Sequence, residues 1–353
     1  MNPIETKILL SQGYAEEEFL RSFSAGALHH SLLITGGMGV GKATFAYRAA
    51  RYVFAHNNPG AKAGFAPALD MGSLVPPEGD EEADYGDGAG VDEPGGVPET
   101  PAAEPDNGAL ALPPSHSVYD RMLSGALADF KIVERGYIGA DRAKRRTEIT
   151  VEQVRALNEF FSTTPAEGGY RVALIDSADE MNANAQNALL KLLEEPPATS
   201  IIMLVCHNPG RVLGTIRSRC RAIRLGRISD ADMERLAGIH LPGLAGADRA
   251  EALRFARGSI GRAVRFCGFG GPDMARALAS GDLRRLAALV SSDEHFEIFS
   301  DMLLSMLNGK IRAAPGEAAF RARDAVRRRI SEARLNLDRA AVVISLMHMV
   351  EKC

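Results

Sequence analysis

The chain has 353 residues, of which 46% are hydrophobic and 24% are charged, and its formal net charge is −4. This is the composition of a globular protein, and the length suits two or three domains. No charged-then-apolar leader opens the chain and no apolar run approaches the roughly 20 residues that cross a bilayer, so we expect a cytoplasmic protein without a membrane span.

The cysteines and histidines indicate no metal site. The cysteines lack a CxxC pair, so neither a thiolate zinc site nor a disulfide framework can be inferred from them. His29 and His30 are adjacent, and a regular helix or strand cannot turn both side chains toward one metal. We therefore expect no metal and mostly buried, reduced thiols at Cys206, Cys220, Cys267 and Cys353.

The net charge is divided unevenly along the chain. Residues 57–114 contain twelve acids and one base, a charge of −11, which leaves +7 for the remainder. This segment is rich in Gly, Pro and Ala and cannot bury enough apolar surface to offset its ordering entropy. We interpret residues 57–114 as a disordered insertion, with an interaction tail as the alternative. The basic remainder is consistent with work near DNA or acidic partners.

On either side of the insertion, apolar runs of strand length alternate with amphipathic stretches of helix length, the pattern of a parallel sheet with crossover helices. Thr150 and Gln153 have capping-box spacing at the start of one such helix. The pattern predicts an α/β domain over residues 1–226, with strands at residues 31–35, 130–134, 170–176, 201–206 and 222–225.

A glycine-rich loop follows the first predicted strand. Residues 36–44 read Gly-Gly-Met-Gly-Val-Gly-Lys-Ala-Thr and match a P-loop in their glycines and lysine. Glycines let backbone N–H groups cradle phosphates, and the lysine reaches the terminal phosphates. The nucleotide-binding candidates are Gly36, Gly39, Gly41, Lys42, Ala43 and Thr44.

Two positions of this nucleotide site lack the groups that hydrolysis needs. Ala43 stands where a Ser or Thr hydroxyl holds magnesium, and Thr44 lies about 100° further round the helix. The strand ending at Asp176 resembles a Walker B strand, but Ser177 stands where AAA+ ATPases place a water-polarising glutamate. We expect the carboxylates of residues 179 and 180 to cap a helix or face solvent. Binding of nucleotide through the glycines and lysine stays open.

From residue 229 onward, strand-like runs give way to helical periodicity. The glycines near residues 258 and 268–271 divide this part into a small helical domain, residues 227–270, and a helical bundle, residues 271–353. The apolar stripes of the bundle are interpreted as its core.

Three runs in the α/β part resemble the clamp-loader branch of AAA+ proteins: residues 178–182 (ADEMN), 187–197 (NALLKLLEEPP) and 215–220 (TIRSRC). The P-loop ending in Gly-Lys-Ala-Thr, Ser177 and residues 167–171 (EGGYR) look most like the delta-prime subunits of bacterial DNA polymerase III, of the alphaproteobacterial type. The resemblance covers residues 25–56 and 115–265, while the C-terminal bundle matches only in length and helical character.

The resemblance implies an AAA+ P-loop domain, a helical lid at residues 227–270 and a helical collar at residues 271–353 that joins a hetero-oligomer. The implied partners are the gamma/tau ATPase and delta subunits of a pentameric clamp loader and, through the complex, the sliding clamp and primed DNA. Arg219, within Ser218-Arg219-Cys220, would serve as an arginine finger for ATP on a neighbour. The alternative for Arg219 is an ordinary surface salt bridge.

Two departures from the family qualify the resemblance. Many delta-prime proteins carry a four-cysteine zinc module after the P-loop helix, and here the cysteine-free insertion stands there, so we expect no zinc. Arg262 lies one residue beyond the place where active AAA+ subunits put a sensor arginine, which leaves its role in doubt.

The main hypothesis is a clamp-loader subunit without intrinsic ATPase activity, within a DNA polymerase holoenzyme, with weak ATP or ADP binding left open. An active gamma/tau-type ATPase is the alternative, favoured by Lys42 and opposed by Ala43 and Ser177. A third hypothesis is a stand-alone repair or recombination ATPase, which the Ser-Arg-Cys motif and the helical C-terminus disfavour.

Overall fold

The computed structural model describes residues 2–56, 108–113, 115–138, 144–244, 246–333 and 339–351. Most of the predicted insertion, residues 57–107, therefore lies outside the described residues. The described residues form two compact units that divide between Asp232 and Met233. Each unit is treated by itself below.

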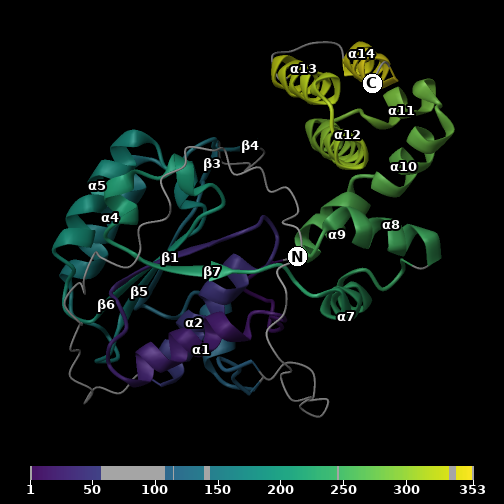
Figure 1. The fold of residues 1–353 in the computed structure, drawn as a ribbon. Coiled ribbons are helices and arrows are strands. Elements are labelled where there is room, and N and C mark those ends of the chain that lie inside the picture. Colours follow the sequence, from purple (N-terminus) through teal and green to yellow (C-terminus); the bar gives the residue numbers. More distant parts are fainter. Residues whose placement is uncertain are drawn as a thin grey trace. The chain divides into compact units, whose positions relative to one another are not determined.

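The first unit is built on a five-stranded parallel sheet with the order β2-β5-β6-β1-β7 (Figure 1). This confirms the predicted α/β fold with a parallel sheet. Apolar runs buried on both faces explain why these segments become inner strands. The strands are β1 (Ser31–Gly36), β2 (Phe130–Val133), β5 (Arg171–Ile175), β6 (Ser200–Val205) and β7 (Arg221–Leu225).

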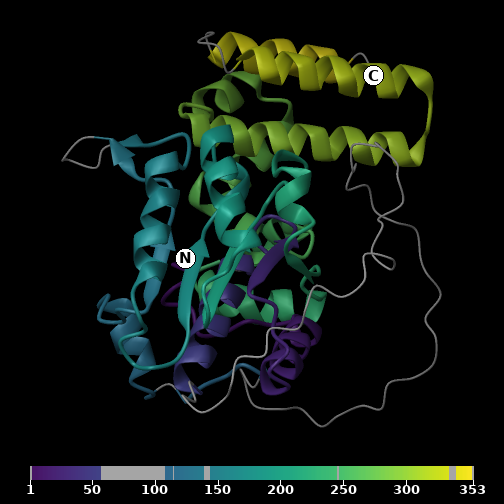
Figure 2. The same cartoon turned by 90° about the vertical axis from the view of Figure 1, so that its left-hand side faces the viewer.

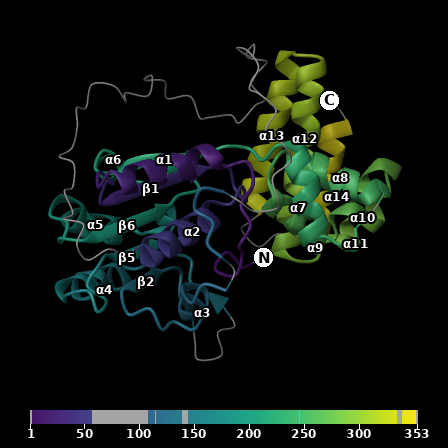
Figure 3. The same ribbon diagram turned by 90° about the horizontal axis from the view of Figure 1, so that it is seen from below.

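Helices cover both faces of this sheet (Figures 1 and 3). Leu32 and Ile34 of β1 pack into a cluster with α1 (Gly13–Ser24) and α2 (Lys42–Ala55). Leu33, which lies between them, packs into a second cluster with α4 (Val151–Ser162) and α5 (Ala183–Glu194). Successive side chains of a strand point to opposite faces, so one strand contributes to both clusters.

Shorter elements complete the first unit. Sequence periodicity did not predict the antiparallel pair β3–β4, because each strand has only two residues and carries no measurable alternation. The short elements are α3 (Val118–Leu123), β3 (Tyr137–Ile138), β4 (Lys144–Arg145), the 3₁₀ turns η1 (Ala178–Glu180) and η2 (Pro209–Arg211), and α6 (Gly214–Arg217).

The predicted capping box at the start of α4 is confirmed. The Thr150 side chain accepts from the backbone of Gln153, and the Gln153 side chain accepts from the Thr150 backbone N–H at 3.0 Å. The Gln153 amide also donates to the Glu134 carbonyl at 2.8 Å. The cap therefore ties the start of α4 to the chain just after β2.

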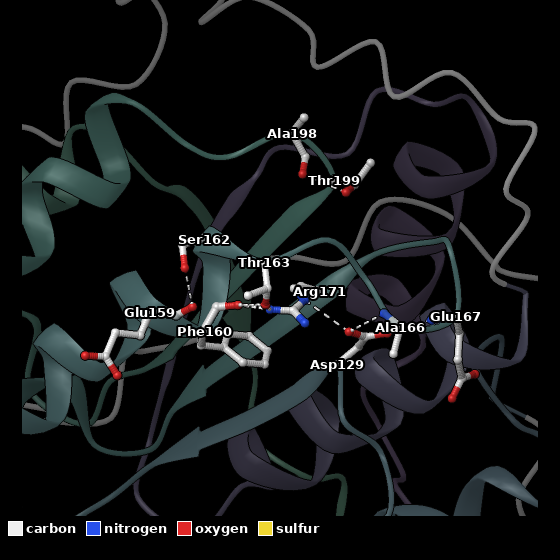
Figure 4. A network of polar contacts seen from close by, with 10 residues as sticks. All are labelled: Asp129, Glu159, Phe160, Ser162, Thr163, Ala166, Glu167, Arg171, Ala198 and Thr199. Carbon is white, nitrogen blue, oxygen red and sulfur yellow. Dashed lines mark hydrogen bonds and ion pairs between the residues drawn. The ribbon is translucent and has the colours of Figure 1, made fainter.

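A buried ion pair fixes the start of β5 (Figure 4). Arg171 Nε lies 3.0 Å from Asp129 Oδ1, and both side chains are largely buried. The Asp129 carboxylate also accepts the backbone N–H groups of Ala166 and Glu167, at 3.0 and 3.1 Å. The Arg171 guanidinium donates to the Phe160 carbonyl near the end of α4. The network thus links α4, β5 and the residues between them, which include the EGGYR segment.

The C-terminal end of the predicted insertion was placed wrongly. Leu110 is buried in the cluster with α1 and α2, and its N–H approaches Glu16 Oε2 at 3.4 Å. Glu16 in turn pairs with Arg48 of α2 at 2.7 Å, with both side chains almost fully buried. Counting acids, glycines and prolines over a long window blurs such an edge, so residues 108–113 belong to the fold.

The second unit is helical. One hydrophobic cluster runs from Ala252 to Val350 and includes all four residues of the first apolar stripe predicted for the bundle, Phe296, Phe299, Leu303 and Leu307. Figure 2 shows the long C-terminal helices side by side, and α12, α13 and α14 pack against one another. The boundary predicted at residue 270 stays a prediction. The helices are α7 (Asp230–His240), which spans the division between the units, α8 (Gly246–Ala256), α9 (Ile260–Gly268), α10 (Gly271–Ser280), α11 (Leu283–Leu289), α12 (Asp293–Ala313), α13 (Glu317–Ala333) and α14 (Arg339–Glu351).

Among the described residues, no helix is both long and apolar enough to cross a membrane. The same part of the chain contains no cluster of His, Cys, Asp or Glu that could hold a metal ion. Cys206, Cys220 and Cys267 are free thiols in this part, and Cys206 is fully buried.

Candidate functional site

The glycine-rich loop joins β1 to α2, as predicted, and three of its glycines adopt backbone conformations that other residues rarely reach. The φ angles are +139° at Gly36, +75° at Gly39 and +103° at Gly41. A Cβ atom on Gly36 would lie 2.5 Å from the Leu225 carbonyl oxygen, and one on Gly41 would lie 2.5 Å from Leu9 Cδ1. Conformation therefore requires glycine at both positions, and at Gly36 the Leu225 carbonyl also leaves no space for a side chain.

Lys42 is bonded to its own loop. It is only 3% exposed, and its ammonium donates to the carbonyls of Gly36 and Gly37 at 2.8 and 2.7 Å. Burial lowers the pKa of Lys42 to about 8, although the nearby acidic groups Asp179 and Asp176 oppose the shift. The two carbonyls take hydrogen bonds that a bound phosphate would otherwise receive.

The structure places both residues of the predicted magnesium position, Ala43 and Thr44, in the first turn of α2. The side chain of Ala43 has no oxygen that could bind magnesium. Thr44, the next residue, is a buried member of the same helix, only 5% exposed.

The Walker B-like strand ends in a contact with a histidine. Asp176 follows β5, and its backbone N–H donates to the Val133 carbonyl at 2.9 Å. Ser177 has φ = +69°, which is unusual for a residue other than glycine. Its hydroxyl lies 3.2 Å from His207 Nε2. The position of the expected glutamate is therefore taken by a hydroxyl that is already paired with an imidazole.

His207 was not predicted to belong to this site. Burial lowers its pKa, and the nearby Lys42 charge acts in the same direction, so the ring is neutral at pH 7. The sequence did contain a signal, because His207 follows a central strand of a parallel sheet. Ligand sites in such folds lie at the carboxyl ends of the strands. The residue was missed because a lone histidine gives no motif.

The expectation for Asp179 was wrong. Its side chain is 6% exposed, and its two oxygens accept the backbone N–H groups of His207 and Asn208, at 2.8 and 3.1 Å. The carboxylate therefore joins η1 to the end of β6 instead of facing solvent or capping its own turn. Glu180 instead forms an ion pair of 2.7 Å with Arg135.

Lys42, Asp176, Ser177, Asp179 and His207 thus form one cluster at the carboxyl ends of β1, β5 and β6. The loop retains the backbone geometry of a phosphate cradle. The donor set does not fit magnesium-dependent hydrolysis, because residue 43 lacks a hydroxyl and residue 177 lacks a carboxylate. No hydrolytic step follows from this arrangement.

Arg219 lies outside this cluster, between α6 and β7. Its Nη1 donates to the Thr215 carbonyl at 2.9 Å, and its Nη2 lies 2.9 Å from Glu194 Oε1. The Arg219 side chain is 38% exposed and that of Glu194 is 50% exposed. The guanidinium is thus held in a defined position on the surface.

Arg262 lies in the second unit, in the first turn of α9. Its guanidinium carbon lies 5.0 Å from the centroid of the Phe255 ring, and its Nη2 lies 3.7 Å from Asp301 Oδ2. These contacts are all within the second unit, so a sensor role for Arg262 stays a prediction.

Comparisons with known proteins find similarity to DNA polymerase III subunits. A family model described as "DNA polymerase III, delta subunit" matches residues 114–229. The delta' subunit of Pseudomonas aeruginosa is 50% identical over 72 residues, and that of Bacillus subtilis is 45% identical over 71 residues. Each match covers 20% of this chain and 22% of the relative. The chain thus spans about a fifth of the length of the curated delta' relatives it matches.

A longer and weaker match is to DNA polymerase III subunit gamma of Buchnera aphidicola, 25% identical over 232 residues, or 65% of this chain and 47% of that protein. The RuvB Holliday junction branch migration motor of Thermotoga maritima is similar with a TM-score of 0.45 and 13% identity, covering 92% of this chain and 84% of that one. A gamma-subunit-related protein of the same organism has a TM-score of 0.36 and 15% identity, covering 64% and 83%.

The range of the family model includes the motifs around Ser177, Lys191 and Arg219. Residues 114–229 thus match a DNA polymerase III delta subunit family model, and the chain is similar over part of its length to curated delta' subunits.

Proposed function

We propose that this protein is the delta-prime subunit of a DNA polymerase III clamp loader. In this role it joins gamma/tau ATPase subunits and a delta subunit, and the complex loads a sliding clamp on primed DNA. The chain itself hydrolyses little or no ATP. Arg219 serves as an arginine finger for the nucleotide bound by an adjacent ATPase subunit.

The observation that carries the proposal is the contrast between the two cationic sites. Lys42 is buried and bonded to its own loop, whereas the Arg219 guanidinium is held on the surface by a carbonyl and a carboxylate. A guanidinium keeps its charge at all physiological pH values and offers forked donors to phosphate oxygens. An exposed arginine fixed in this way suits work on a nucleotide held by another chain.

The test is the ATPase and clamp-loading rate of a reconstituted loader containing Arg219→Ala. Trans-acting arginine fingers contribute about 10³ to 10⁵ in rate in GTPases. Only one of several ATP sites would border this chain, so we expect partial loss of total turnover and a larger loss of loading. Arg219→Lys should rescue poorly because an ammonium lacks the planar fork.

Arg221→Ala is the matched control. Arg221 lies two residues after Arg219 and also forms an exposed ion pair, with a distance of 2.9 Å to Glu18. We expect wild-type rates from this variant. Wild-type rates from Arg219→Ala at confirmed full assembly would assign Arg219 to an ordinary surface salt bridge and refute the proposed role.

The alternative function, an active gamma/tau-type ATPase, is supported by the P-loop glycines and by the match to a gamma subunit. Steady-state turnover by the isolated chain distinguishes it. A rate near the roughly 1 per second or more that is typical of enzymes would favour the alternative. A background rate is expected for the delta-prime proposal.

A further inference from the structure

Glu194, which forms an ion pair with Arg219, is the last residue of α5. The C-terminal end of a helix carries a partial negative charge, so a carboxylate there is unfavourable for the helix itself. The ion pair with Arg219 offsets this repulsion. The placement of Glu194 is therefore understood through Arg219 and not through the stability of α5.

The Arg219 guanidinium contacts two acceptors, a backbone carbonyl and a carboxylate. Nη1 donates to the Thr215 carbonyl, and Nη2 faces the Glu194 carboxylate, both at 2.9 Å. Because the contacts use different nitrogens, the one at Nη2 can change while the one at Nη1 holds the orientation. The carboxylate occupies a position that one oxygen of an incoming phosphate would take.

We propose that Glu194 is an exchangeable counter-ion that positions Arg219 in the free chain and gives up Nη2 to a phosphate oxygen of the partner's nucleotide. This inference rests on the proposed trans-acting role of Arg219. Both side chains are exposed to solvent, and exposed ion pairs are weak, so a multiply charged polyphosphate can displace the carboxylate. Glu194 is thus a positioning residue that competes with the nucleotide for Arg219.

The experiment measures ATP-dependent turnover of the reconstituted loader containing Glu194→Gln. The amide oxygen still accepts a hydrogen bond, while the competing charge is gone. We expect the ATP concentration for half-maximal turnover at the bordering site to fall by up to about fivefold, the factor that corresponds to the upper range for an exposed ion pair. Maximal turnover should change much less.

Glu195→Gln provides the matched control, because it removes the same charge from the next residue, which is also exposed. It should leave the ATP dependence as in the wild type. The combination of Glu194→Gln with Arg219→Ala should behave as Arg219→Ala alone, since the counter-ion acts only through the arginine.

The outcomes separate the two proposals. If Arg219→Ala lowers turnover while Glu194→Gln leaves the ATP dependence unchanged, the counter-ion inference fails and the arginine finger stands. If Glu194→Gln has the same effect with and without Arg219, Glu194 acts independently and the inference fails as well. If Arg219→Ala has no effect, the proposed function fails, and the inference with it.

Discussion

At the scale of the residue, Lys42 combines the lysine of a P-loop motif with an unusual environment. Its ammonium is almost fully buried, and two carbonyls of the P-loop accept its hydrogen bonds. Removing a charge from water is costly, and these carbonyls compensate only partly, which is why the pKa falls to about 8. Phosphate binding would have to release Lys42 from the carbonyls of its own loop.

Replacing Lys42 with Met should change the pH dependence of stability. The unfolded chain keeps the ordinary lysine pKa of 10.5, so between about pH 8 and 10.5 it binds more protons at Lys42 than the native state does. Wild-type stability should therefore rise with pH through this window relative to Lys42→Met, by about 2 kcal/mol between pH 7 and pH 10. Urea unfolding of both proteins at the two pH values measures the difference.

Titration of all other groups is common to both proteins and cancels in this comparison. A constant difference in unfolding free energy from pH 7 to pH 10 would show that the native pKa of Lys42 is not lowered, either because the ammonium is hydrated or because the two carbonyls offset its burial fully.

The contact between Ser177 and His207 bears on attempts to restore hydrolysis. In a chain with Ala43→Ser and Ser177→Glu, the new carboxylate would lie beside the imidazole and the Lys42 ammonium, which attract it away from a water molecule. We expect steady-state ATP turnover of this variant to stay far below the roughly 1 per second typical of enzymes.

An independent measurement follows the histidine in the same variants. Its pKa lies below the ordinary 6.5 in the wild type, and a carboxylate at residue 177 should raise it because the imidazolium would gain a counter-ion. NMR titration of His207 in Ser177→Glu gives this shift. An unchanged pKa combined with restored turnover would show that the carboxylate points to water and that His207 leaves it free.

At the scale of the element, the sequence predicted what depends on local patterns. Buried apolar runs gave the five parallel strands, and the Thr150–Gln153 spacing gave the start of α4. The contact between Asp179 and His207 could not be predicted in the same way, because the two residues lie 28 positions apart in the chain. Their contact depends on two neighbouring strands of the sheet, and no local pattern contains it.

The capping box of α4 leads to a stability prediction. Thr150→Ala removes the acceptor for an N–H group in the first turn and should lower the free energy of unfolding by about 1 kcal/mol. Chemical denaturation measures the loss. Thr147→Ala is the control, because residue 147 is exposed and precedes the helix, and it should change stability by no more than about 0.5 kcal/mol. Equal losses in the two variants would contradict a capping role for Thr150.

At the scale of the whole molecule, composition located a long acidic segment but misplaced its end. Residues 108–113 (GALALP) contain no acid but share the Gly, Ala and Pro content of residues 57–107, and yet Leu110 is 2% exposed in the first hydrophobic cluster. Burial of one leucine depends on the space left beside α1 and α2, which composition does not describe. The fold therefore resumes before the predicted boundary at residue 114.

Two linker replacements test this boundary. In the first, a short flexible linker replaces residues 57–107, whose composition predicts little buried apolar surface, and stability should stay nearly unchanged. In the second, the linker replaces residues 57–113 and removes Leu110 together with its approach to Glu16. Loss of a buried leucine typically costs about 2 to 5 kcal/mol, so the second variant should be destabilised by an amount in this range.

Chemical denaturation of both variants beside the wild type gives the two differences in unfolding free energy, with linkers matched in composition and adjusted so that each spans its gap. The comparison isolates residues 108–113, because both variants lack the acidic segment. A loss of several kcal/mol in the first variant would show that residues 57–107 pack against the body. Equal stability of the two variants would instead show that Leu110 contributes nothing, and the boundary predicted from composition would then be correct in energetic terms.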